Sequence, residues 1–246
     1  MEESVSFYSQ GARLFANLHL PSEGAPCVVM SHGLESSKDG AKWRALTPQL
    51  YEQGFAVFRF SYRGCGRGRH RSQGNYEDTT LTGRIADYRA ALAFVEGSGI
   101  DRGRVGVVGS SFGGMVAIAA NDSRIKAMVA LATPLDFPRP SAEEMATVAE
   151  LGYYELPSGR RLKPGFFDDL RAYDLRQKAS QLCCPLLIIH GERDEVVPIS
   201  HAYELNRLAG GPRRLEVIAG GSHSLNSPRH LKAIAQLIID WFRRYL

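Results

Sequence analysis

Long apolar runs are missing from this sequence. No stretch approaches the roughly 20 consecutive apolar residues that a membrane-spanning helix requires. The opening segment, MEESVSFYSQ, carries two glutamates and lacks the apolar core of a secretory signal. We therefore expect a cytoplasmic protein that acts without a membrane.

Cysteines are also few, and positive charges exceed negative charges only slightly. The net charge of +4 is too small to predict a nucleic-acid partner. The cysteines show neither zinc-ligand spacing nor a Cys-x-x-Cys pair, so we interpret them as structural thiols. Cys183 and Cys184 precede an apolar run, which predicts that both are buried.

The sequence does contain short apolar runs that alternate with helical patterns, and its 246 residues fit one α/β domain. Residues 5–9 and 14–20 predict an antiparallel strand pair. Later Val/Ile/Leu-rich runs predict buried parallel strands at 26–33, 54–62, 104–110, 125–132, 184–191 and 213–220. Helical spacing of apolar residues follows at 81–95 and 231–242. This order predicts a mostly parallel sheet with helices on both faces.

One long interruption separates two of these strands, at about 135–169. Such a segment inside a compact domain is usually functional or disordered, and its aromatic residues argue against disorder. We expect a small cap over the carboxyl edge of the sheet. Its large side chains either form an apolar substrate pocket or only pack the cap onto the domain. They are Met145, Tyr153, Tyr154, Phe166 and Phe167.

Two serines end the run VGVVGSSFGG at 105–114. A nucleophile on a sharp strand-to-helix turn, the nucleophile elbow, requires small residues two positions before and after it. Ser111 has Gly109 and Gly113 there, whereas Ser110 has Val108 and Phe112. Ser111 is therefore the predicted nucleophile, with a helix N-cap as the alternative role.

A serine nucleophile needs a base, and an acid must orient that base. With this type of turn the chain order is Ser, acid, His. His223 lies in a glycine-loosened loop after the last strand and is the predicted base. His201 and His230 fall in helical patterns typical of surface residues, and His190 ends a strand as a core residue would.

Asp194, in the loop after the strand at 184–191, is the predicted acid. Asp136, which follows an earlier strand, is the alternative. A metal site formed by His190, Glu192 and Asp194 finds no other support in the sequence. The oxyanion hole is expected from the backbone N–H groups of Phe112 and Leu34, the latter in the loop after the strand at 26–33.

Together the segments SHGLESSKDG, GSSFGG, HGERDEVVP and GGSH resemble the α/β-hydrolase superfamily over nearly the whole chain. Within it, the chain is similar to compact serine esterases with a short inserted cap, cinnamoyl or feruloyl esterase-like or serine aminopeptidase-like. The resemblance implies one domain over 1–246, with the cap at about 135–169. It also implies a catalytic triad of Ser111, Asp194 and His223.

The expected activity is that of a carboxylesterase, hydrolysing small esters through an acyl-enzyme, with aryl or hydroxycinnamoyl esters as candidates. The chemistry needs no metal or organic cofactor, and we expect a monomer or homodimer whose partner is a small-molecule ester. Amide cleavage at a free amino terminus is an alternative, with Glu143, Glu144, Glu150 and Glu155 as possible amine ligands. A non-catalytic binding protein on the same fold is another.

A loop at 63–71 contains more arginine than this superfamily usually has there. Arg63, Arg67, Arg69 and Arg71 would form either an anion-binding edge or a solvated loop with one internal structural arginine. Its glycines do not have dinucleotide-binding spacing.

Overall fold

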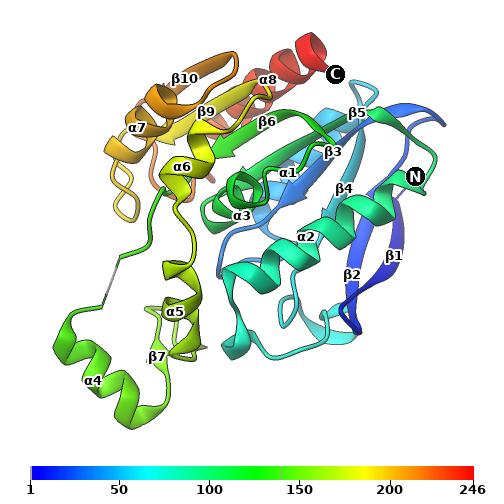
Figure 1. The fold of residues 1–246 in the computed structure, drawn as a ribbon. Helices are drawn as coiled ribbons and strands as arrows, with labels where there is room; N and C mark the ends of the chain where they lie inside the picture. Colours follow the sequence, from blue (N-terminus) through cyan, green and yellow to red (C-terminus); the bar gives the residue numbers. More distant parts are fainter. Residues whose placement is uncertain (1, 139) are drawn as a thin grey trace.

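The computed structural model of the protein describes residues 2–138 and 140–246. Its centre is a sheet of eight strands in the order β1-β2-β4-β3-β5-β6-β9-β10 (Figure 1). Strand β2 is antiparallel to both of its neighbours, and the pairs from β4 to β10 are parallel. The strands are β1 (Glu2–Ser9), β2 (Ala12–His19), β3 (Ala25–Ser31), β4 (Ala56–Phe60), β5 (Ile100–Ser110), β6 (Ile125–Leu131), β9 (Leu186–Gly191) and β10 (Arg213–Ile218). The predicted mostly parallel sheet with an antiparallel N-terminal pair is confirmed.

Helices cover both faces of this sheet. On one face, α1 (Ala41–Tyr51) and α8 (Pro228–Tyr245) pack over one cluster of buried apolar residues. On the other, α2 (Leu81–Glu96), α3 (Phe112–Ala120), α6 (Leu175–Ser180) and α7 (Ser200–Leu208) pack over a second cluster. Every residue of β4 and β9 is buried, as expected for strands covered on both sides.

Between β6 and α6 the chain forms the predicted insertion, which we call the cap (Figure 1). It contains α4 (Ala142–Leu151), the two-stranded sheet of β7 (Tyr154–Glu155) and β8 (Arg161–Leu162), and α5 (Gly165–Arg171). Phe166 of α5 packs on Phe112 at the start of α3, with ring centroids 5.7 Å apart. The cap thus packs directly on Phe112, the residue that follows the predicted nucleophile.

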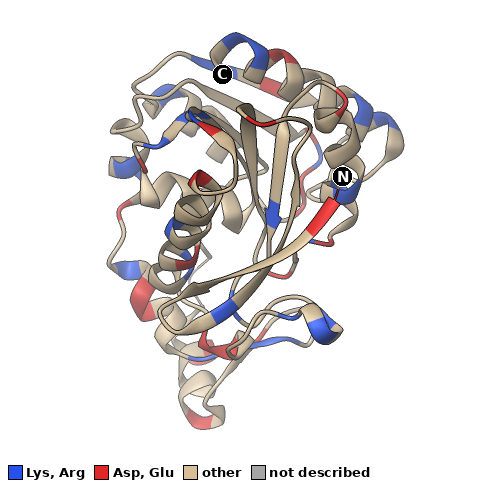
Figure 2. Cartoon of the chain, turned by 90° about the vertical axis from the view of Figure 1, so that its right-hand side faces the viewer, with Lys and Arg blue, Asp and Glu red and all other residues tan. Residues whose placement is uncertain are grey.

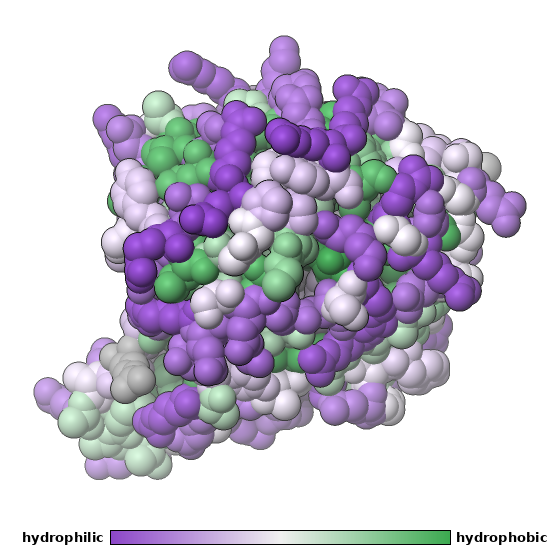
Figure 3. All heavy atoms as spheres, turned by 45° about the horizontal axis from the view of Figure 1, so that its top comes forward, coloured by the Kyte–Doolittle hydropathy of each residue, from purple (hydrophilic) through white to green (hydrophobic). Residues whose placement is uncertain are grey.

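Charged residues of both signs are interspersed over the helices and loops (Figure 2), while strands β3 and β9 carry no Asp, Glu, Lys or Arg. On the face shown in Figure 3, hydrophilic side chains divide the apolar residues into separate areas. Within the described part of the chain, no helix combines the length and apolar character needed to cross a membrane.

The structure corrects the predicted burial of Cys183 and Cys184, and it shows which arginine of the loop at 63–71 is internal. Cys183 is exposed and Cys184 only half-buried, because both lie in the turn before β9 rather than in the strand. In the arginine-rich loop, which contains a 3-10 helix at Gly68–His70 and precedes another at Tyr76–Asp78, Arg63 is the internal arginine. It binds the buried carboxylate of Asp87 at 2.6 Å.

Candidate active site

Ser111 occupies the turn between β5 and α3 in a backbone conformation that non-glycine residues seldom adopt, with φ 52° and ψ −124°. The flanking glycines make this turn possible. A Cβ on Gly109 would lie 2.5 Å from Gly114 Cα, and one on Gly113 would lie 2.1 Å from the Ser31 carbonyl oxygen of β3. The turn is therefore so tightly packed that only glycine fits at either position.

The predicted base and acid lie beside this serine. His223 Nε2 is 3.1 Å from Ser111 Oγ, and His223 Nδ1 is 2.9 Å from Asp194 Oδ2. These contacts join residues that lie 112 and 29 positions apart in the sequence. The loops after β5, β9 and β10 supply them, because the carboxyl ends of these parallel strands meet at one edge of the sheet.

Asp194 is held by more groups than His223 alone. Its side chain has no exposed surface, and its Oδ1 accepts hydrogen bonds from the backbone N–H groups of Val196 and Val197. His190 Nε2 lies 3.2 Å from Asp194 Oδ2 and also donates to the carbonyl oxygen of Val197. Burial acts to raise the pKa of Asp194, but the hydrogen bonds from the two histidines and the two amides outweigh it and hold the pKa well below its usual range. The carboxylate therefore stays charged beside the imidazole.

The other candidates have different partners. His190 is fully buried, in the core position that the sequence indicated, but it also supports the acid, which sequence reasoning missed. His230 lies on α8, where its backbone N–H is capped by Ser227. Glu192 accepts a hydrogen bond from the Gly220 backbone instead of joining His190 and Asp194 around a metal.

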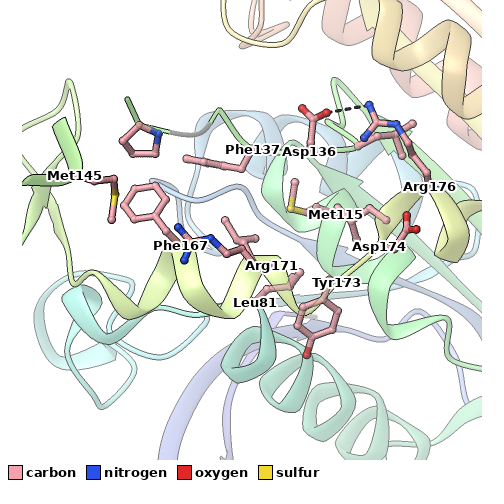
Figure 4. Close-up of a pocket in the computed structure, with 14 residues that line it drawn as sticks. Leu81, Met115, Asp136, Phe137, Met145, Phe167, Arg171, Tyr173, Asp174 and Arg176 are labelled. Carbon is pink, nitrogen blue, oxygen red and sulfur yellow. Dashed lines mark hydrogen bonds and ion pairs between the residues drawn. The ribbon is translucent and has the colours of Figure 1, made fainter. Parts of the chain in front are cut away.

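Asp136, the alternative acid, forms an ion pair with Arg176 at 2.9 Å (Figure 4). Its other oxygen faces His201 Nε2 at 3.7 Å. His201 is not simply a surface residue, as its helical pattern suggested: it lines the cavity beside Ser111 and accepts a hydrogen bond from the Leu135 backbone.

The loop after β3 lies against the nucleophile. A Cβ on Gly33 would be 3.4 Å from Ser111 Cβ, so the backbone of this loop reaches the serine. The Gly33 carbonyl oxygen, which belongs to the peptide unit carrying the Leu34 N–H, accepts from His32 Nδ1 at 2.7 Å and from Arg84 at 3.2 Å. The other predicted donor, Phe112 N–H, is the first amide of α3 and so has no acceptor within its own helix.

Two buried side chains fix this loop. His32 Nε2 accepts from the Tyr62 backbone N–H at 3.1 Å, so His32 is neutral and protonated on Nδ1. Burial, followed by the charge of Arg84, lowers the pKa of His32 to about 3, which keeps it in that form. Arg84 donates to the Leu34 carbonyl oxygen at 2.8 Å and lies over the rings of Tyr62 and Phe112.

Ser111 opens into a cavity of about 680 Å³ between the loop after β3, the start of α1, the cap and the His223 loop. Of the five cap residues predicted to contact substrate, Tyr154 lines it. The other four do not line this cavity. Met145 and Phe167 line a separate cavity beneath the cap (Figure 4), Phe166 packs on Phe112, and Tyr153 lies under the Arg161 guanidinium.

The sheet order, the strained serine turn and the convergence of the three loops define an α/β hydrolase. More particularly, the chain belongs to the prolyl oligopeptidase family, whose family model matches residues 42–246.

The chain is also similar to individual proteins. The chain is 28% identical over 229 residues to an uncharacterized protein of Mycobacterium tuberculosis, covering 93% of this chain and 72% of that protein. It is 29% identical over 191 residues to the mitochondrial palmitoyl-protein thioesterase ABHD10 of Mus musculus, covering 70% and 60%. The structure of Est1E from Butyrivibrio proteoclasticus with bound ferulic acid has the same fold, with a TM-score of 0.85 at 21% identity and 98% coverage of both chains.

Proposed function

We propose that this protein is a serine esterase that hydrolyses small carboxylic esters through an acyl-enzyme on Ser111. One observation carries the proposal. The Ser111 hydroxyl faces an open cavity and is hydrogen-bonded to His223, whose other nitrogen is bound to the charged, buried carboxylate of Asp194. This is the arrangement that makes a serine hydroxyl nucleophilic near neutral pH.

In the first half of the reaction, Ser111 Oγ attacks the ester carbonyl carbon while its proton passes to His223 Nε2. Asp194 stabilises the resulting imidazolium and keeps Nδ1 protonated. The tetrahedral oxyanion accepts hydrogen bonds from the N–H groups of Leu34 and Phe112. The carbon–oxygen bond to the alcohol then breaks, and the alcohol leaves with the proton from His223.

In the second half, water replaces the alcohol. His223 takes a proton from the water, whose oxygen attacks the acyl carbon on Ser111. Collapse of this second tetrahedral intermediate releases the carboxylic acid and returns the proton to Ser111 Oγ. His223 carries each proton in turn, first from Ser111 to the alcohol and then from water to Ser111, and no cofactor enters the scheme.

An aryl or hydroxycinnamoyl acyl group suits the cavity wall, which includes the aromatic side chains of Trp43, Phe112, Phe137 and Tyr154. Est1E, which shares the fold, has a structure with ferulic acid bound. We therefore place esters of flat aromatic acids first among the substrates to be tested.

Amide hydrolysis is the second candidate, favoured by the family to which the chain belongs. The cap glutamates proposed to bind a substrate amine have other positions: Glu143, Glu144 and Glu150 lie on α4, and Glu155 pairs with Arg161. Glu35, an exposed carboxylate in the wall of the cavity, takes their place as the amine ligand for this candidate. Comparing an aryl acetate with an aminoacyl anilide separates the two activities.

The test is loss of turnover in Ser111→Ala. We expect kcat for a short aryl ester to fall on the order of 10⁶-fold, because the nucleophile is removed. The neighbouring Ser110→Ala variant is the matched control and should retain far more activity than Ser111→Ala. A fluorophosphonate should label the wild type at Ser111. Substantial turnover by Ser111→Ala, or an unlabelled wild type, would refute the proposal and favour the non-catalytic alternative.

A further inference from the structure

A buried lysine lies beside the proposed nucleophile. Lys42 is the second residue of α1, only 9% of it is exposed, and it lines the same cavity as Ser111. Its Nζ donates a hydrogen bond to Ser110 Oγ at 2.9 Å. Because an ammonium group has three N–H donors, two remain for another partner.

The charge of Lys42 lacks the carboxylate partner that Lys38 and Arg63 have. Lys38, in the loop before α1, pairs with Asp39 at 2.9 Å, and Arg63 pairs with Asp87 at 2.6 Å. Within residues 2–138 and 140–246, no carboxylate lies within 4.0 Å of Lys42 Nζ. A buried charge without a counter-ion is costly, so an anion bound in the cavity would be stabilised there.

The carboxylates around this cavity have partners other than Lys42. Asp194 binds His223 and Asp136 binds Arg176, while the exposed Glu35 accepts a hydrogen bond from the Ser158 hydroxyl. The imidazoles of His201 and His223 also face the cavity. In addition, the first turn of α1 forms part of the wall, and the partial positive charge of a helix N-terminus favours an anion at the same place.

We propose that Lys42 binds a carboxylate on the substrate, so that the preferred esters carry a negative charge on either the acyl or the alcohol part. The inference rests on the proposed esterase function and narrows its substrate class. The charged group would accept hydrogen bonds from the two remaining Lys42 donors while the ester carbonyl lies at Ser111.

The titration of Lys42 provides a test in the wild-type protein. Burial lowers the pKa of Lys42 to about 8, against the opposing effect of the Asp194 charge. Lys42 is therefore mostly charged at pH 7 and mostly neutral at pH 9. The preference for an anionic ester should be present below pH 8 and be lost above it.

The experiment compares kcat/KM for esters that differ in one charge. On the acyl side the pair is mono-4-nitrophenyl adipate and 4-nitrophenyl hexanoate. On the alcohol side it is 4-acetoxybenzoate and its methyl ester. Uncatalysed hydrolysis is subtracted, and the ratio of anionic to neutral ester cancels any effect of pH that is the same for both substrates.

We expect one pair to favour the anion at pH 7, and that pair shows which part of the substrate faces Lys42. The ratio should fall about 10-fold from pH 7 to pH 9 as Lys42 loses its proton. Lys42→Met should reduce the ratio at pH 7 on the order of 10-fold or more, the usual effect of losing a hydrogen bond to a charged group. Lys232→Met, which changes an exposed lysine of α8, is the matched control.

Hydrolysis of the neutral esters with no anionic preference in either pair would overturn the Lys42 inference and leave the esterase proposal intact. An equal loss on both members of a pair in Lys42→Met would also overturn it, because that result indicates a structural role. If Lys42→Met does not fold, the wild-type pH series decides. Absence of hydrolysis of all four esters would instead refute the proposed function.

Discussion

Asp194 is the side chain whose surroundings distinguish a triad from an ordinary surface ion pair. It is shielded from solvent and accepts hydrogen bonds from two backbone amides, with two histidines beside it. In the proposed mechanism this carboxylate orients His223 as the base, whereas Asp136 is paired with Arg176 instead.

We predict that Asp194→Asn lowers kcat for an aryl ester on the order of 10⁴-fold, because an amide there permits the wrong tautomer of His223. Asp136→Asn should reduce kcat by less than about 10-fold. Steady-state kinetics of the two purified variants decide the matter. The reverse order of effects would make Asp136 the acid.

The residues of the proposed triad were predictable from sequence because each has a local signal. Glycines flank Ser111, while Asp194 and His223 follow apolar strands in the required order. The supporting residues have no such signal. Lys42 and Ser110 are 68 positions apart, and Arg84 and Leu34 are 50 apart, so only the fold shows that they touch.

At the scale of elements, α2 holds the loop after β3 in place through Arg84. This guanidinium binds the carbonyl oxygens of Gly33 and Leu34, and it does so in a buried site where it also packs on Phe112. One side chain of α2 thus holds the peptide unit that carries the Leu34 N–H, one of the two proposed oxyanion donors, and packs on the ring of Phe112, which carries the other.

We predict that Arg84→Met lowers kcat for an aryl ester by about 10-fold or more with a smaller change in KM. The reason is that the Leu34 N–H loses its fixed position, and misplaced oxyanion donors act mainly on the transition state. Arg84→Lys should restore part of kcat. Thermal unfolding of both variants is the control, since a change in KM alone, or in stability alone, would assign Arg84 a structural role.

The cap shows why composition alone does not predict which of its side chains line the cavity beside Ser111. An inserted segment must bury its own apolar side chains, and Phe166 and Phe167 do so against Phe137 and Phe112. Composition shows that such residues are present, but it does not show whether they face the substrate or the domain. The order of strands and helices, in contrast, follows from periodicity, which depends on neighbours in the sequence.

At the scale of the whole molecule, the buried neutral His32 links folding to pH. Its pKa is lowered to about 3 in the folded protein, whereas an unfolded histidine titrates near 6.5. Below about pH 6.5 the unfolded chain therefore binds one more proton than the folded chain at this residue. Stability is lost as the pH falls from there toward the folded value.

We predict that the free energy of unfolding of the wild type falls more steeply with decreasing pH than that of His32→Asn. The difference in slope should approach about 1.4 kcal/mol per pH unit between pH 6 and pH 4. Urea titrations of both proteins at several pH values measure it. Parallel curves would show that His32 does not supply this linkage.

The most direct test of the account is to trap the covalent intermediate. Wild-type protein is quenched with acid during turnover of a 4-nitrophenyl ester, digested, and analysed by mass spectrometry. We expect the acyl group on Ser111, and no acylated peptide from Ser111→Ala treated in the same way. An acyl group on Ser110 or on another residue, or rapid turnover with no acylated peptide, would contradict the central claim.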